Sequence, residues 1–307
     1  MNIGGIFLAL QGAVSQGILW GVLVLGVYIT YKILDIADLT VDGSFALGGC
    51  ICATFVVGYG MNPFLALIIS TLAGMIAGAV TGFLHTVFEI PAILSGILTQ
   101  IALWSINLRI MGKSNIPLLK SKTIFSGFME LTGLKSSQVS AIIGILIAII
   151  LISALYWFFG TEIGSALRAT GNNEDMIRAL GVNTKMTKMI ALMLSNGLVG
   201  LSGGLVCQSQ KYADIGMGTG AIVIGLAAVI IGEVLFGKFA SKRKLAFAFT
   251  LASVILGAVI YYMVYQFVLW LKMPSEDMKL FSAIVVAIFL AIPYLKEKRT
   301  LRKGASK

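Results

Sequence analysis

Long apolar runs recur along the chain, and each is about as long as a helix that crosses a membrane. Such a helix needs roughly 20 mostly apolar residues. The candidate runs are 13–33, 40–58, 63–87, 91–111, 139–159, 186–209, 219–236, 245–270 and 279–295. The first 12 residues are apolar but interrupted by Gly and Gln, so they form either an interfacial helix or a short extra span. The pattern predicts an all-α membrane bundle of about 8–10 transmembrane helices, in one domain over residues 1–307.

Composition supports a membrane protein. Hydrophobic residues make up 58% of the chain and charged residues only 12%, whereas about 25% of the residues of a soluble domain are charged. The mean hydropathy is +0.96. Too few polar side chains are present to cover a water-facing surface, which excludes a soluble enzyme and a disordered protein. The 3 cysteines lack the spacing of a zinc site.

The placement of the positive charges predicts the orientation in the membrane. The net charge is +10. With nine spans and a cytoplasmic C-terminus, most Lys and Arg residues fall in the inner segments, as the positive-inside rule requires. The basic tail 296–307 then anchors the topology, and we expect no nucleic-acid partner. The outer loop 112–138 is more basic than this orientation favours.

One connection, residues 161–188, is long and polar, and it contains the signals of a short helix. Asn172 or Asn173 is a suitable N-cap, and Gly181 is placed as a C-terminal glycine. Between them, Glu174 and Asp175 favour the helix dipole, and Met176, Ile177 and Leu180 form a small apolar face next to Arg178. A helix of two turns is not stable alone in water. We therefore expect it to dock on a partner.

Polar residues within apolar runs are candidates for a transport path, because a polar group in a membrane is costly. The candidates are Asp42, Ser44, Thr99, Gln100, Ser195 and Asn196. Two interpretations remain open for them. Asp38 and Asp42 suit helix capping as well as translocation, and Gln100 and Asn196 suit hydrogen bonding between helices as well as lining of a path.

Small residues recur at helical spacing in the third run. Gly74, Gly78 and Gly82 lie on one helix face. Such a face lets two helix backbones approach closely. It serves either internal packing or a seam between moving helices.

Catalytic and nucleotide-binding motifs are missing from the sequence. His85 is the only histidine, so a histidine metal cluster is excluded. Residues 232–238 imitate a phosphate-binding loop, but Phe239 replaces the Ser or Thr that would hold Mg²⁺. We therefore expect a non-catalytic chain with no cofactor of its own.

Four stretches, taken in order, resemble a known family. Residues 38–44 read Asp-Leu-Thr-Val-Asp-Gly-Ser, and residues 164–174 read Gly-Ser-Ala-Leu-Arg-Ala-Thr-Gly-Asn-Asn-Glu, followed by Arg-Ala-Leu-Gly-Val at 178–182. Residues 198–204 and 227–232 continue the likeness, although Glu233 stands where glycine is commoner. Over about residues 13–295 the chain resembles the ribose and branched-chain amino acid permeases of ABC importers, and it is nearest their tryptophan and tyrosine subgroup.

This resemblance implies a multi-pass permease in a bacterial cell membrane. Two permease copies would form an alternating-access path, an extracellular solute-binding protein or lipoprotein would deliver the solute, and a cytoplasmic ABC ATPase dimer would hold the ATP and Mg²⁺. The short helix, with residues 172–178, 180 and 181, would couple to that ATPase. The solute would be an aromatic or hydrophobic amino acid, with a sugar or nucleoside as the alternative. An ion-coupled secondary transporter and a membrane enzyme are the competing classes.

Overall fold

The computed structural model describes residues 3–119, 121–240 and 245–270, together with residues 280, 284, 287 and 291. Within these residues it is a helix bundle, which confirms the predicted all-α fold. The helices are α1 Ile3–Tyr28, α2 Thr40–Ala53, α3 Pro63–Thr86, α4 Ala92–Met111, α5 Ile124–Thr132, α6 Ser136–Gly160, α7 Glu162–Asn172, α8 Glu174–Ala179, α9 Thr184–Gln210, α10 Ala221–Ala240 and α11 Ala246–Trp270. Two π-helical turns, Ile29–Ile33 and Thr54–Gly58, extend α1 and α2.

Seven helices in the described part of the chain are long and apolar enough to cross a membrane. They match seven of the predicted runs. The eighth run is shorter, because its apolar stretch in α10 covers only Ala221–Gly237. The predicted run 279–295 falls mostly outside the described residues, and the basic tail 296–307 falls wholly outside them.

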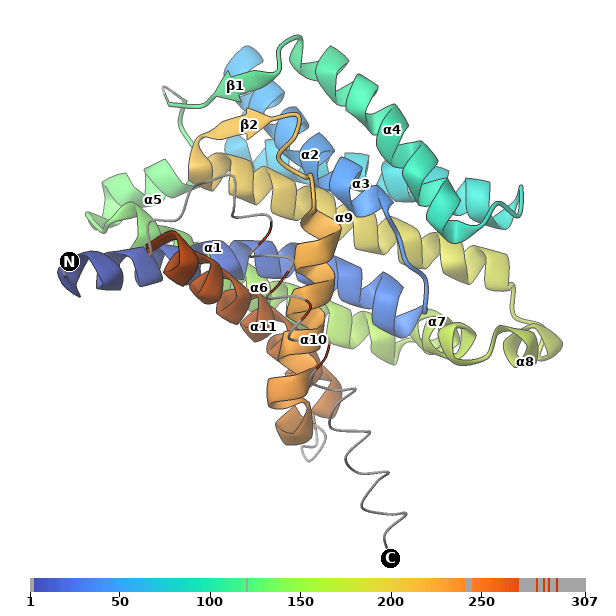
Figure 1. Ribbon diagram of the computed structural model, residues 1–307. Helices are drawn as coiled ribbons and strands as arrows, with labels where there is room; N and C mark the ends of the chain where they lie inside the picture. Colours follow the sequence, from blue (N-terminus) through green and yellow to red (C-terminus); the bar gives the residue numbers. More distant parts are fainter. Residues whose placement is uncertain are drawn as a thin grey trace, which may run out of the picture.

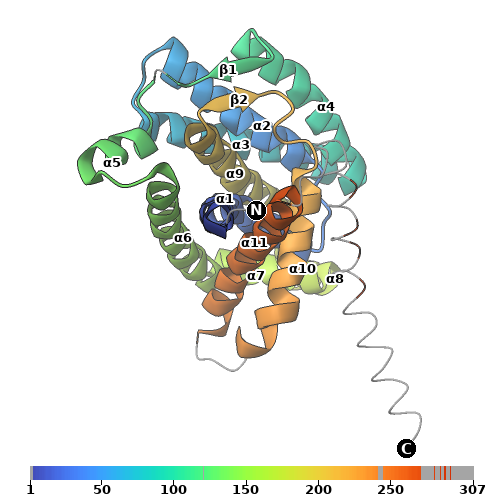
Figure 2. The same cartoon turned by 60° about the vertical axis from the view of Figure 1, so that its left-hand side comes forward.

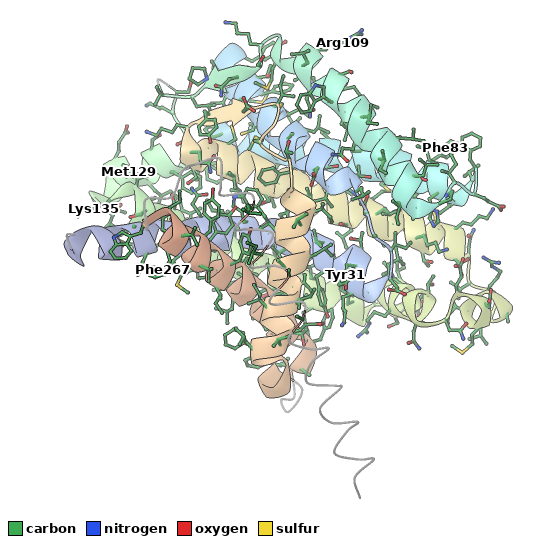
Figure 3. The ribbon with its side chains drawn as sticks, viewed as in Figure 1. Tyr31, Phe83, Arg109, Met129, Lys135 and Phe267 are labelled. Atoms are coloured by element: carbon green, nitrogen blue, oxygen red, sulfur yellow. The ribbon has the colours of Figure 1, made fainter. Side chains whose placement is uncertain are left out.

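The two ends of the bundle carry different structures (Figure 1). At one end, strands β1 Asn115–Pro117 and β2 Tyr212–Asp214 pair in antiparallel fashion, with Ile116 opposite Ala213, and α5 lies nearby. We call this the hairpin end. At the other end, α7 and α8 connect α6 to α9, and we call it the α8 end. Figure 3 shows Met129 and Lys135 at the hairpin end and Tyr31 toward α7.

Helix α1 forms the centre of the bundle (Figure 2). It contacts α6, α9, α10 and α11. Its side chains Leu19 and Leu23 are fully buried. By contrast α3, α4 and α6 present large apolar side chains outward, as Ile76, Ile101 and Trp157 show with exposed fractions of 65%, 64% and 73%. Such surfaces suit contact with lipid.

Glycines bring α9 close to α3 and α2. A Cβ atom on Gly74 or Gly78 would lie 2.2 Å from the carbonyl oxygen of Asn196 or Leu192. A Cβ atom on Gly48 would lie 2.0 Å from the carbonyl oxygen of Gly200. Only glycine allows backbones to approach this closely. The predicted glycine face is therefore a packing surface of the bundle.

Candidate functional site

Two helices, not one, form the polar connection at the α8 end. The sequence predicted α8 but not α7. Helix α7 begins after Thr161, whose side chain accepts a hydrogen bond from the backbone N–H of Gly164. Leu167 is fully buried, and a Cβ atom on Gly171 would lie 1.8 Å from the carbonyl oxygen of Ile33. Helix α7 is therefore packed against the end of α1 and gives α8 a fixed support.

Helix α8 has a cap at each end, as predicted. Asn173 is the N-cap, and its side chain accepts a hydrogen bond of 3.0 Å from the backbone N–H of Met176. Asn172 is instead the last residue of α7. After the helix, Gly181 (φ +86°) donates to the carbonyl of Arg178 and Val182 donates to that of Ile177, which is a Schellman motif. These caps satisfy backbone groups that so short a helix would otherwise leave open.

Glu174 ties α8 to α9. Its carboxylate lies 2.5 Å from the Nζ of Lys188 and 2.8 Å from the guanidinium of Arg178. Burial raises the pKa of Glu174, but hydrogen bonds from Lys188 and Thr184 and the charges of Lys188 and Arg178 outweigh it and hold the pKa below its ordinary value. Asp175, the other predicted acid, is exposed.

The apolar residues of α8 separate into two groups, so the prediction of a single apolar face is wrong. Ile177 is 6% exposed and packs inward, which anchors the helix. Met176 and Leu180 are 50% and 72% exposed, and Met186 at the start of α9 is 54% exposed. Met186 was missed because it lies among polar residues in the sequence. Three large apolar side chains thus stand on a polar surface at the α8 end.

Asp42 caps a helix other than its own. The backbone N–H groups of Gly220 and Ile222 donate to its two carboxylate oxygens at 2.9 and 2.8 Å. These groups belong to the start of α10, and a Cβ atom on Gly218 would lie 1.9 Å from the carbonyl oxygen of Asp42. Helix α10 therefore begins inside the bundle, against α2. Irregular backbone at this depth is tolerated only where protein satisfies it.

Asp38 and Asn196 connect the start of α2 to the middle of α9. One oxygen of the buried Asp38 carboxylate accepts from the backbone N–H of Thr40, the first residue of α2, at 2.9 Å, while Leu39 occupies the N-cap position. The other accepts from the side-chain amide of Asn196 at 2.6 Å. Asn196 also donates to the carbonyl of Leu192. Asn196 thus links α9 to the segment before α2, and its Oδ1 is buried without a hydrogen-bond partner among the described residues.

The other four path candidates lie within helix contacts. Thr99 belongs to a chain of hydroxyl groups in which Thr81 bonds both Thr99 and Thr40, and it joins α2, α3 and α4. The Ser195 hydroxyl donates to the carbonyl of Gly26. Of the two remaining candidates, Ser44 is buried and Gln100 is half-buried. The structure therefore disperses the predicted path residues among helix interfaces.

An aromatic cavity of about 270 Å³ lies toward the hairpin end, where β2 and the end of α9 contribute to it. Its lining residues are Trp20, Phe45, Val206, Gln210, Tyr212, Met217, Ile224, Tyr261, Tyr262 and Tyr265. They come from α1, α2, α9, β2, the segment before α10, α10 and α11. None of the predicted path residues is among them. Sequence reasoning missed this cavity because all of its rings except that of Tyr212 lie in apolar runs, where aromatic residues ordinarily pack against lipid or core.

The rings of this cavity pack on one another. The centroid of Trp20 lies 4.5 Å from that of Phe45 and 5.5 Å from that of Tyr262, and Tyr262 lies 6.1 Å from Tyr265. These distances are in the range of favourable aromatic pairs. Among the described residues the buried Nε1 of Trp20 has no hydrogen-bond partner. No charged side chain is among the described lining residues.

A second cavity, of about 560 Å³, opens at the α8 end between the end of α1, α7 and α11. Arg168 lines it, donates to the carbonyl of Phe159 at 2.6 Å and lies over the ring of Phe247. Lys32, also in its lining, forms an ion pair of 2.9 Å with Glu233 of α10. Glu233, which departs from the family pattern, therefore links α10 to α1.

Comparison with known proteins gives a consistent result. A family model described as "Branched-chain amino acid transport system / permease component" matches residues 9–293. The tyrosine transport system permease protein of Clostridioides difficile is 43% identical over 90% of this chain and 88% of its own length. A probable branched-chain amino acid transport permease of Methanocaldococcus jannaschii is 28% identical over 73% of each chain. The ribose import permease of Escherichia coli K12 is 26% identical over 64% of this chain and 60% of its own.

Among solved structures, PsaBC from Streptococcus pneumoniae in complex with a Fab matches 81% of this chain and 89% of its own. The TM-score is 0.35 and the sequence identity 16%.

Proposed function

Because the chain belongs to the branched-chain amino acid transport permease family of ABC-type importers, we propose that two copies of it form an alternating-access path for an aromatic or hydrophobic amino acid. A separate ATPase supplies the energy, and an extracellular solute-binding protein delivers the solute. The observation that carries the proposal is the α8 end, where a capped helix presents apolar side chains on a polar surface.

Helix α8 is built to dock on a partner. Met176, Leu180 and Met186 are exposed, while Ile177 and Glu174 fix the helix to its own chain. Exposed apolar side chains rimmed by polar residues mark protein-interaction sites. An ATPase bound there would push or pull on α9 through the ion pair of Glu174 with Lys188. Such movements of packed helices underlie alternating access.

This assignment orients the chain in the membrane. An ATPase is cytoplasmic, so the α8 end faces the cytoplasm and the hairpin end faces outward. Helix α11 runs from the α8 end toward the hairpin end. A further span at 279–295 would then return the basic tail 296–307 to the cytoplasm, as the positive-inside rule favours.

The choice of solute rests on two observations. The relative from Clostridioides difficile is a tyrosine transport permease, and the aromatic cavity lies at the end where the solute would enter. A ribose permease is also a relative, so a sugar is the alternative that the experiment must separate. Transport of radiolabelled tyrosine, isoleucine and ribose by the complete complex distinguishes these solutes.

Two substitutions test the docking surface. Met176→Asp and Leu180→Asp place a charge on the exposed face of α8 without removing a hydrogen bond described here. We expect each to lose co-purification of the ATPase and at least 10-fold of ATP-driven uptake, because a buried unpaired charge opposes docking. The matched control is Leu131→Asp, since Leu131 is 83% exposed on α5 at the opposite end.

Full uptake and full ATPase binding in both α8 variants would refute the docking surface. Loss of ATPase binding in the Leu131→Asp control as well would show a general effect of added charge. Purification of the wild-type permease with no ATPase would overturn the proposed function itself.

A further inference from the structure

We propose that the aromatic cavity selects the solute by holding its aromatic ring, with the Nε1 of Trp20 donating a hydrogen bond to a ring hydroxyl. The solute class is an amino acid with a phenolic side chain. This inference rests on the proposed transport function and deepens it, because it assigns the recognition to particular residues.

The first argument is the chemistry of the lining. Six of the ten lining residues are aromatic, and none of the ten is charged. Aromatic rings attract another ring through offset or edge-to-face packing. The rings of Phe45 and Tyr262 lie 4.5 and 5.5 Å from that of Trp20, tilted to it by 34° and 43°. A flat aromatic ring can therefore pack against such a lining.

The second argument is the difference between the two sides of the cavity. Trp20 and Phe45 are 8% and 0% exposed, so their side is dry. Tyr212 is 41% exposed and Gln210 is half-buried, so their side is open to water. The charged amino and carboxylate groups of an amino acid cannot enter the dry side without partners. The side chain of the solute therefore enters first, and its charged groups stay near Gln210 and Tyr212.

The third argument is the free N–H of Trp20. Its Nε1 is buried and has no hydrogen-bond partner among the described residues. Indole N–H groups usually find a partner when buried, and indole nitrogen can only donate. The proposal requires the ring to enter with its para position toward Trp20, so that the phenolic oxygen accepts a hydrogen bond from Nε1. Phenylalanine would fill the same space and leave the donor unpaired.

The size of the site agrees with a single ring. The cavity measures about 270 Å³, slightly below the ~300–1,000 Å³ typical of sites for drug-sized ligands. With no charged side chain among the described lining residues to pair with its amino and carboxylate groups, the solute would bind weakly. Weak binding suits a transport path, since the solute has to leave again.

The substitution Trp20→Phe tests the donor while keeping a ring. We propose uptake of radiolabelled tyrosine and phenylalanine by proteoliposomes that contain the permease and its ATPase, with the solute-binding protein added. We expect Trp20→Phe to lower tyrosine uptake about 10-fold more than phenylalanine uptake at limiting solute, a change in selectivity that equals about 1.4 kcal/mol. The matched control Trp157→Phe changes an exposed residue of α6 and should alter neither uptake.

A second measurement does not depend on Trp20. Tyr212→Cys places a thiol on the water-facing side of the cavity, whereas the native cysteines Cys50, Cys52 and Cys207 are buried. A membrane-impermeant maleimide should label this new thiol. Tyrosine in millimolar excess should slow the labelling, and ribose should not.

The outcomes separate this inference from the proposed function. If Trp20→Phe lowers the uptake of tyrosine and of phenylalanine equally, or lowers neither, the Trp20 N–H does not select the solute. Uptake of tyrosine by the wild type would still support the importer. If tyrosine leaves the labelling rate of Tyr212→Cys unchanged, or if ribose slows the labelling, the aromatic cavity is not the site that binds the solute. Wild-type complexes that bind the ATPase but transport only ribose would overturn the solute class in both proposals.

Discussion

Asp42 holds the start of α10 inside the bundle, and removing its carboxylate should destabilise the protein strongly. In the wild type the backbone N–H groups of Gly220 and Ile222 donate to the Asp42 carboxylate at 2.9 and 2.8 Å. In the variant Asp42→Ala both N–H groups lose these acceptors. Little water can replace the carboxylate in the interior of a membrane bundle. Both donors would then lose their partner in a partly buried position.

The magnitude follows from the two bonds. A hydrogen bond to a charged group contributes about 1.5–3 kcal/mol, so the two together contribute about 3–6 kcal/mol. In soluble domains of 150–250 residues 1 kcal/mol changes the melting temperature by about 2–4 °C. We therefore expect Asp42→Ala to melt on the order of 10 °C lower. In Asp42→Asn only one side-chain oxygen remains to accept a hydrogen bond, so the melting temperature of this variant should lie between those of the wild type and of Asp42→Ala.

The assay is thermal unfolding of the detergent-purified protein, followed by size-exclusion chromatography, together with uptake normalised to folded complex. Glu130→Ala and Glu130→Gln are the matched controls, since Glu130 is an exposed carboxylate on α5. If Asp42 is a cap, uptake per folded complex survives in Asp42→Asn. Loss of uptake in Asp42→Ala with a melting temperature within about 2 °C of the wild type would refute the capping role and restore Asp42 to the path.

Two further predictions concern packing and pH. Gly78→Ala should lower the unfolding free energy by about 1–3 kcal/mol, because the new Cβ would lie 2.2 Å from the carbonyl oxygen of Leu192. The control Gly12→Ala should not lower it, because nothing lies within 4 Å of a Cβ atom at Gly12. Equal melting curves for the two variants would contradict this prediction. The pKa of Glu174 is lower in the folded protein than in the unfolded chain. Its stabilising effect is therefore complete above the unfolded pKa and is lost as the pH falls through the folded pKa. Hydrogen exchange of residues 174–182, corrected for intrinsic rate, should show this loss in the wild type and none in Glu174→Gln.

The parts that sequence could predict are those with local signals. Helix α8 was predicted because Asn173 and Gly181 cap it within a few residues. The membrane runs were predicted from length and hydropathy alone. Helix α7 was not predicted, because its stability comes from the burial of Leu167 and from contact of Gly171 with the end of α1. No pattern in the sequence places residue 171 against residue 33.

The start of α10 shows the same limit. The sequence predicted a span from residue 219, but the cap that lets α10 begin inside the bundle is Asp42, which is 178 residues from Gly220 in the sequence. The aromatic cavity was also out of reach. Five of its six rings come from α1, α2 and α11, and each of these looks like an ordinary apolar residue within its own run.

The path candidates show why polarity alone is an incomplete guide in a membrane chain. Every buried polar group in lipid must be satisfied, so helices that begin inside the bundle need carboxylates and amides for that purpose. Asp38, Asp42 and Asn196 serve it here. Recognition of a solute that must bind and leave needs groups that are not already committed to the fold. Among the described residues the buried polar atoms without a hydrogen-bond partner are Trp20 Nε1, Ser44 Oγ, Asn107 Oδ1 and Asn196 Oδ1. None of them belongs to a charged side chain, so the groups free to recognise a solute are to be sought among aromatic and neutral polar side chains and not among the carboxylates that hold the helices in place.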